Sequence, residues 1–139
     1  MSQPRPLLHH VVFAIGLERL DAAARYLSDL GFEFQAFDHG ELRLAIRLDW
    51  DRGVELISPL ADAPTEPGTA ADFLARHGDG LFSVVVRVAD TDAAERTAER
   101  HGTRADFRQH VAGDGSELTE VKLEPMFGIP ITLMETNLP

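Results

Sequence analysis

The sequence predicts an α+β fold of two tandem βαβββ modules that form a pseudo-twofold, partly closed sheet around a groove. First, residues 8–58 and 81–135 each run from an apolar strand through a helix to a closing strand. Second, the helices share a segment, Leu20-Asp21-Ala22-Ala23 in one and Thr91-Asp92-Ala93-Ala94 in the other. Third, a sheet with a helix on one face needs cover on its other face. Paired modules provide that cover and enclose a groove suited to a small molecule.

The size and composition of the chain favour a single domain. Of its 139 residues, 44% are hydrophobic, which is enough for a packed core. Cysteine is absent, so disulfides and thiolate sites are excluded. We expect one domain over residues 1–139, with the first module at 7–58, a linker with a short helix at 59–80, and the second module at 81–136.

The charge of the chain excludes one class of partner. The formal net charge is −10 and the isoelectric point is near 4.9, which argues against a surface that follows nucleic-acid phosphates. The N-terminal segment lacks the apolar core of a signal peptide, and no apolar run approaches the roughly 18 residues of a membrane span. We therefore expect neither nucleic-acid nor membrane partners, and a cytoplasmic location.

The first module is predicted to contain one helix and four strands. Alternation in the opening strand, 8–15, puts His10, Val12 and Ala14 on one side. Leucine and alanine recur at helical spacing over 17–30, and Gly31 suits the left-handed residue that follows a helix. The remaining strands are 31–37 and 41–48, which form a hairpin turning at 38–40, and the closing strand 54–58.

The elements of the linker and the second module are predicted from similar local residue patterns. Prolines and small residues over 59–68 break regular structure, and a short helix is expected at 70–76. Asp90 or Thr91 can cap the next helix. Pro130 has no N–H, so we expect an unpaired position or an edge there. The predicted elements are strands 81–88, 103–110, 117–123 and 129–135 and a helix over 92–100.

The two modules differ at matching positions. The first has His10 on its opening strand and Glu55 on its closing strand, where the second has Ser83 and Thr132. A carboxylate on an apolar strand is rarely buried without a partner, and His10 is the obvious candidate. Two interpretations stay open: a purely structural pair, or a pair that faces a ligand. The acidic stretch 117–124 is interpreted as solvated surface.

Four segments resemble a known superfamily, and together they span nearly the whole chain. Leu-His-His-Val-Val at 8–12 and Gly-Val-Glu-Leu-Ile-Ser-Pro at 53–59 resemble its strands that carry the first and second metal ligands. Segments 77–84 and 123–129 resemble its glycine-rich turn before paired histidines and the turn before its last strand. This is the vicinal oxygen chelate superfamily, which includes glyoxalase I, bleomycin-resistance proteins, extradiol dioxygenases and methylmalonyl-CoA epimerase. The epimerase-like members are the most similar.

The resemblance implies a degenerate metal site. Complete members hold a divalent ion with two histidines and two carboxylate or amide oxygens, and the ion stabilises an enolate. His10 and Glu55 match the first two ligands. Phe82 and Ser83 stand where the superfamily has paired histidines, and Thr132 stands where it has the last carboxylate. We expect no tightly bound cofactor, and at most a weakly held divalent metal at His10 and Glu55.

Three functions are compatible with this pattern. The first is a protein that binds a small, largely apolar organic ligand in the inter-module groove, as bleomycin-resistance proteins do. Its candidate ligand-binding residues are Phe82, Ser83, Thr132 and Trp50, although Phe82, Ser83 and Thr132 also suit plain packing and Trp50 suits a half-exposed lid.

The second function is a lyase or epimerase, of the methylmalonyl-CoA epimerase or glyoxalase type, that abstracts a proton next to a carbonyl. It would act with or without a weakly held metal, and its catalytic residues would be Glu55 and His10. The third is a structural or regulatory homodimer with a vestigial groove. Because superfamily members often associate through their sheets, we expect a homodimer under each hypothesis.

Overall fold

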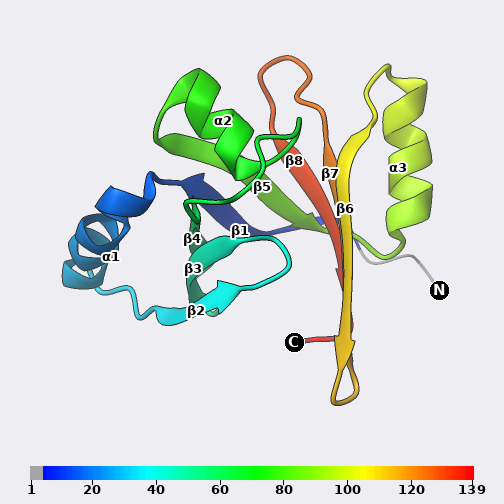
Figure 1. Cartoon of the computed structure of the whole chain (residues 1–139). Helices are drawn as coiled ribbons and strands as arrows, with labels where there is room; N and C mark the ends of the chain where they lie inside the picture. The colour runs from blue at the N-terminus through cyan, green and yellow to red at the C-terminus, as the bar shows by residue number, and fades with distance from the viewer. Residues whose placement is uncertain (1–4) are drawn as a thin grey trace. The chain divides into compact units, whose positions relative to one another are not determined.

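The computed structural model describes residues 5–139 (Figure 1). The first part of the chain contains β1 (Leu7–Ala14), the 3₁₀ turn η1 (Leu17–Arg19), α1 (Leu20–Asp29), β2 (Gln35–His39), β3 (Leu44–Asp49), β4 (Val54–Pro59) and α2 (Ala70–His77). The second contains β5 (Gly80–Arg87), α3 (Thr91–Arg100), β6 (Ala105–Gly113), β7 (Ser116–Leu123) and β8 (Ile131–Thr136). The order confirms the predicted α+β class and its two βαβββ modules.

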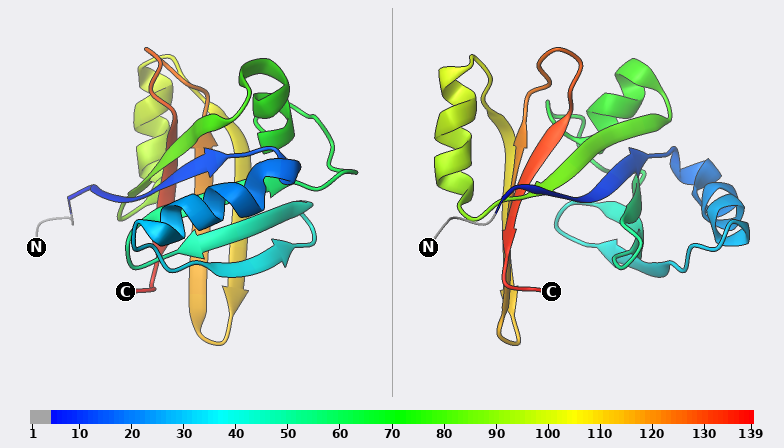
Figure 2. Two further views of the ribbon diagram at one scale, coloured as in Figure 1. Left: turned by 90° about the vertical axis from the view of Figure 1, so that its left-hand side faces the viewer. Right: turned by 180° about the vertical axis from the view of Figure 1, so that it is seen from behind.

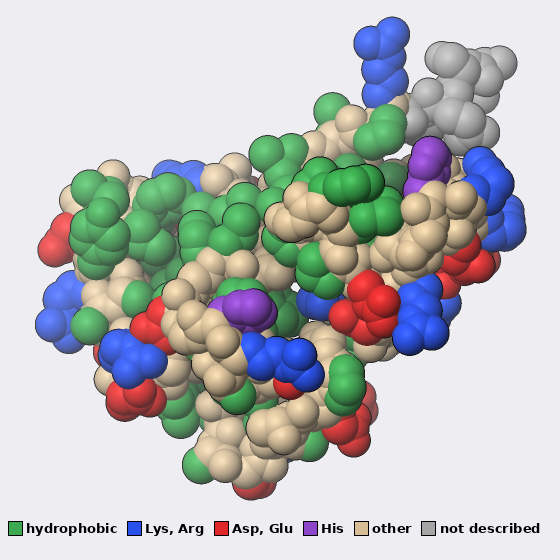
Figure 3. Space-filling view, turned by 90° about the horizontal axis from the view of Figure 1, so that it is seen from above, with side chains coloured by type: hydrophobic (Ala, Val, Ile, Leu, Met, Phe, Trp, Pro, Cys, Tyr) green, Lys and Arg blue, Asp and Glu red, His purple; other side chains and the backbone are tan. Residues whose placement is uncertain are grey.

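The described chain groups into two compact units, which we treat separately. The first unit comprises residues 10–82, and the second comprises residues 83–139 together with residues 5–9. None of the described residues forms a helix long and apolar enough to cross a membrane. Acidic and basic side chains lie next to one another on the face in Figure 3, in keeping with exposed ion pairs such as Arg43–Asp62.

The first unit packs α1 against one face of its sheet, whose strand order is β2-β3-β4-β1. β1 and β4 are parallel, and the other neighbours are antiparallel. Because successive side chains of a strand point to opposite faces of the sheet, every second residue of these strands points toward α1. The core formed there contains Leu20 of α1 and Ala45, Val54 and Leu56 of the sheet, with Val11, Phe13, Ala23 and Leu27 packed around them.

Several predicted boundaries in the first unit are wrong. The strand expected over 41–48 begins at Leu44, so the hairpin turns at 40–43 and not at 38–40. The helix expected over 17–30 begins as the 3₁₀ turn η1 and becomes α-helical only from Leu20. The strand expected from Gly31 begins at Gln35. The backbone N–H of Glu33 donates to Asp49 Oδ2 at 2.9 Å, so this stretch is held by a side chain rather than by the strand ladder.

The second unit packs α3 against a sheet of order β5-β8-β7-β6, as the views of Figure 2 show. Small residues of α3, Ala94 and Ala98, meet Val121, Leu123 and Leu133. The predicted cap is confirmed, because Asp90 accepts a hydrogen bond from the N–H of Ala93. The β6–β7 hairpin turns at Asp114 and Gly115, whose positive φ angles match a type I′ turn.

The interpretation of residues 117–124 as solvated surface is wrong. Val121, Lys122 and Leu123 are buried in β7, while Glu117 is exposed. Val121 and Leu123 pack against α3, and Lys122 points to the opposite face, where it pairs with Asp106. Pro130 lies just before β8, where its missing N–H interrupts no ladder, and its carbonyl accepts a hydrogen bond from Val84 N at 2.8 Å.

Candidate functional site

His10 and Glu55 are neighbours on two parallel strands of the first unit. Register pairs Val12 of β1 with Glu55 of β4, so His10, two residues earlier, points to the same face of the sheet. The imidazole Nε2 lies 3.4 Å from Glu55 Oε1. The His10 side chain is 4% exposed and that of Glu55 is 19% exposed, so solvent reaches the pair mainly through the carboxylate.

The face that carries this pair is largely apolar apart from two β2 side chains, Gln35 and His39, and is turned away from α1. Because alternate residues share a face, the residues on it follow from the strand registers. The apolar ones are Val12 and Ala14 of β1, Ile57 of β4, Leu44, Ile46 and Leu48 of β3, and Phe37 of β2. Val12, Ala14, Ile46 and Ile57 are buried, whereas Phe37 is 44% exposed. The imidazole and the carboxylate are thus polar groups at the end of a hydrocarbon surface.

Trp50 lies beside His10. Their ring centroids are 6.1 Å apart with an interplanar angle of 39°. Trp50 is partly buried and sits in the turn after β3, which Asp49 fixes by accepting hydrogen bonds from the N–H groups of Glu33 and Arg52. Burial raises the pKa of the Asp49 carboxyl, but these two N–H groups and the Arg52 guanidinium outweigh burial and leave the pKa below its usual value.

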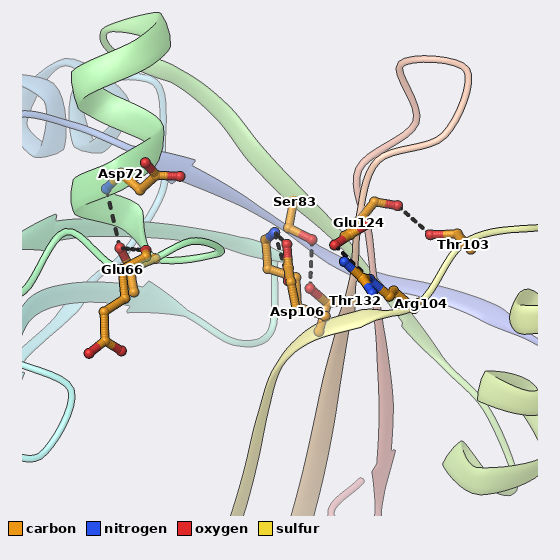
Figure 4. Close-up of polar contacts among 10 residues, drawn as sticks. Glu66, Asp72, Ser83, Thr103, Arg104, Asp106, Glu124 and Thr132 are labelled. Carbon is orange, nitrogen blue, oxygen red and sulfur yellow. Dashed lines mark hydrogen bonds and ion pairs between the residues drawn. The ribbon is translucent and has the colours of Figure 1, made fainter.

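Ser83 and Thr132 form a closed hydroxyl pair in the second unit. Ser83 Oγ and Thr132 Oγ1 are 2.6 Å apart on the parallel neighbours β5 and β8, and both residues are buried (Figure 4). Each hydroxyl therefore has a partner of its own kind. The sequence pattern placed these residues at matching positions but did not predict that they bond to each other.

A buried ion pair next to the hydroxyls was missed from the sequence. Lys122 Nζ lies 3.1 and 3.2 Å from the two carboxylate oxygens of Asp106, and the side chains of Lys122 and Asp106 are 10% and 15% exposed. Lys122 of β7 stands directly opposite Thr132 of β8. One feature of the sequence could have pointed to this residue. Lys122 is the only lysine in the chain, which otherwise uses arginine for its permanently charged basic residues.

Phe82 contacts α2 within the first unit. Its ring meets the ring of Phe73, from α2, edge to face at a centroid distance of 5.5 Å. Ser83 follows it directly on β5, and consecutive strand residues point to opposite faces. Glu135 also faces away from Thr132, since its carboxylate accepts a hydrogen bond from Thr91 N at the start of α3.

The side chains do not fit a divalent ion. In the described part of the chain, no group of three or more histidine, cysteine, aspartate and glutamate residues could hold one. The first unit offers one imidazole and one carboxylate. The second offers two hydroxyls bonded to each other, beside an ammonium group that repels a cation. Divalent ions in this kind of site need several anionic or imidazole donors.

Comparison with known proteins gives a family and a set of similar structures. The model of the glyoxalase-like domain matches residues 8–123. A hypothetical protein of Bacillus halodurans is 19% identical, with a TM-score of 0.72 over 98% of each chain. Methylmalonyl-CoA epimerase of Mycobacterium tuberculosis is 25% identical, with a TM-score of 0.62 over 92% of this chain and 86% of that one.

A second epimerase extends the comparison. Methylmalonyl-CoA epimerase of Streptomyces coelicolor, in complex with 2-nitronate-propionyl-CoA, is 22% identical, with a TM-score of 0.68 over 99% of this chain and 100% of that one. A search of the curated proteins found no significant match.

Proposed function

The chain belongs to the glyoxalase-like domain family of the vicinal oxygen chelate superfamily, and we propose that it binds a small, largely apolar organic molecule without using a divalent metal. One observation carries the proposal: the His10–Glu55 pair lies at the end of an apolar sheet face, next to an indole ring. Small-molecule sites commonly combine an apolar lining with a few such polar groups.

Each part of this face has a role in the proposed complex. The carboxylate of Glu55 accepts a hydrogen bond from a hydroxyl of the ligand, and the nearby imidazole holds that carboxylate in place. The aliphatic residues remove hydrocarbon from water, which contributes about 25 cal/mol for each Å² buried. Trp50 offers an aromatic surface for a ring. A phenol, with one ring and one hydroxyl, meets all three requirements.

Trp50 provides the readout for a direct test, because it is the only tryptophan in the chain. Titration with a panel of small phenols should change its fluorescence saturably. Glu55→Gln should weaken binding by about tenfold, since it removes a charged acceptor. Glu41→Gln, at an exposed position, is the matched control and should bind as the wild type does. Unchanged affinity in Glu55→Gln would argue against the assignment.

The same pair favours a second candidate function, the removal of a proton next to a carbonyl group. Glu55 is the candidate base, and the approach of His10 to its carboxylate within 3.4 Å is the observation that supports it. Because the chain is similar to two methylmalonyl-CoA epimerases, the substrates to test are thioesters with an acidic proton on the carbon next to the carbonyl group. Deuterium from D₂O should enter methylmalonyl-CoA or a simpler thioester with wild-type protein but not with Glu55→Gln. No exchange in such a panel would exclude this candidate.

A further inference from the structure

We propose that the second unit binds a free amino acid with an aliphatic side chain, such as leucine, in a hollow at one end of its sheet. The hollow has a volume of about 550 Å³, and every residue that lines it belongs to this unit. It lies where β5 and β8 end and β7 begins, beside the short connection from β5 to α3. This ligand differs in class from the phenol proposed above, and different residues recognise it.

Arg87 gives the hollow a positive charge that lacks an acidic partner. Three arginines of the described chain are partly buried, and two of them, Arg43 and Arg47, form ion pairs with aspartates. The third, Arg87, donates a hydrogen bond of 2.8 Å from Nη2 to the carbonyl oxygen of Thr136, but no carboxylate within residues 5–139 pairs with it. Partial burial makes an unpaired charge costly. Four of the five N–H donors of this guanidinium are therefore left for the carboxylate of a ligand.

Glu117 gives the hollow a negative charge. Its carboxylate has no hydrogen bond or ion pair within the described chain, and it does not pair with Arg87 although both residues line the hollow. Asn137 fixes the backbone here, since its Oδ1 accepts from Glu117 N and its Nδ2 donates to the Gly115 carbonyl, both at 2.8 Å. A molecule that carries both an ammonium and a carboxylate satisfies the two unpaired charges together.

The charges of the whole lining also fit a zwitterion. The lining carries equal numbers of basic and acidic side chains, namely Arg5, Arg87, Glu117 and Glu135. Its formal charge is therefore zero. The glutamates repel a dicarboxylate and the arginines repel a diamine, whereas each charged group of an amino acid finds an opposite charge. Glu135 accepts a hydrogen bond from Thr91 N, which holds its carboxylate in place.

The apolar part of the lining favours an aliphatic side chain on the ligand. Three aliphatic residues add hydrocarbon beside the charged groups, namely Leu7, Val88 and Ala89. Leu7 is 64% exposed, so a ligand side chain that covers it removes apolar surface from water. A combination of apolar lining and a few charged groups is common in sites for small molecules.

Three probes with one carbon skeleton test whether both charges are recognised. Leucine should bind saturably in isothermal titration calorimetry. Isocaproate, which lacks the ammonium, and isoamylamine, which lacks the carboxylate, should each bind at least about tenfold more weakly. If leucine does not bind, or if either analogue binds as tightly as leucine, the proposal is wrong.

Variants of Arg87 test the role of the guanidinium. Arg87→Gln should weaken leucine binding by about tenfold or more, because the amide lacks the positive charge. Arg87→Lys should keep part of the affinity, and Arg96→Gln, at an exposed position of α3, should keep all of it. If Arg87→Gln binds leucine as the wild type does, the arginine serves only its bond to Thr136 and the proposal fails.

Glu117→Gln covers the case in which Arg87→Gln does not fold, because Glu117 is exposed and its side chain holds no other element. This variant should bind leucine about tenfold more weakly, but it should bind isocaproate at least as tightly as the wild type does. The reason is that the carboxylate attracts an ammonium and repels a plain acid. Glu99→Gln, at an exposed position of α3, is the matched control. Equal weakening of leucine and isocaproate in Glu117→Gln would overturn the assignment.

Discussion

Ser83 Oγ and Thr132 Oγ1 are 2.6 Å apart, and the hydrogen bond between them joins β5 to β8 inside the second unit. The counterparts in the first unit are an imidazole and a carboxylate 3.4 Å apart. The two modules thus share a scaffold but differ in the donors that they present. Two neutral hydroxyls can satisfy each other, whereas the His10–Glu55 pair keeps a charged acceptor that a ligand can use.

The hydroxyl pair should show strong coupling in a double-mutant cycle. Ser83→Ala and Thr132→Val each leave one buried hydroxyl without its partner, so each should destabilise the protein by about 1–3 kcal/mol. The double variant removes both groups and should be less destabilised than the sum of the single variants. Urea unfolding of the four proteins measures this, and simple additivity would show that the hydroxyls do not depend on each other.

Asp79 should make the stability of the first unit sensitive to acid. Its carboxylate accepts hydrogen bonds from the Arg19 side chain and from Gly16 N, and these lower the pKa of Asp79 to about 2. Because the folded-state pKa lies below the unfolded-state value, the stabilisation is present above about pH 4 and is lost as the pH falls toward 2.

Asp79→Asn tests this effect. We expect the variant to be less stable at neutral pH by about 1 kcal/mol, a modest value because the pair is partly exposed and screened by solvent. The difference in urea midpoint between the wild type and the variant should shrink below pH 4. A difference that stays constant down to pH 2 would contradict the assigned cause.

Glu95 should anchor α3 to its sheet. This buried residue accepts hydrogen bonds from both Nη atoms of Arg108 in β6, and the Glu95 carboxylate raises the pKa of Arg108. Glu95→Ala leaves the guanidinium without its carboxylate, so we expect a loss of about 1–3 kcal/mol. Glu99→Ala, at an exposed position of the same helix, should stay within about 0.5 kcal/mol of the wild type in the same unfolding experiment.

The cap of α3 should be replaceable by another short polar residue. Asp90 accepts a hydrogen bond of 3.1 Å from Ala93 N, and Asp90→Ala removes it at a cost of about 1 kcal/mol. Asp90→Ser should recover most of that loss, since serine caps helices nearly as well. Thermal unfolding monitored by circular dichroism compares the three proteins, and an Asp90→Ser variant as unstable as Asp90→Ala would refute the cap.

The sequence was enough for the element order because each element has a local signal. Alternation indicated β1, helical spacing followed by Gly31 indicated α1, and a polar cap with a segment shared with α1 indicated α3. His10 was predicted as the partner of Glu55 because a carboxylate on an apolar strand needs one, and the two side chains are 3.4 Å apart. The start of β2 was wrong because the bond from Glu33 N to Asp49 is a contact between distant residues that no local pattern contains.

The ion pair of Lys122 and Asp106 was missed for a related reason. Lys122 stands in a stretch rich in charged residues, and such a stretch is normally a solvated surface. Its burial depends on residues of the neighbouring strands, among them Asp106 of β6 and Thr132 of β8, which no local pattern contains. A register irregularity between Ala105 and Phe107, at Asp106, is likewise invisible in the sequence.

The central claim is that this glyoxalase-like protein binds its ligand without a divalent metal. Elemental analysis of protein produced in metal-replete medium and purified without chelators tests it most directly. We predict far less than one divalent ion per chain, and no rise in melting temperature when Mn²⁺, Co²⁺, Ni²⁺ or Zn²⁺ is added. One ion per chain in the wild type, lost in His10→Ala and in Glu55→Gln, would contradict the account.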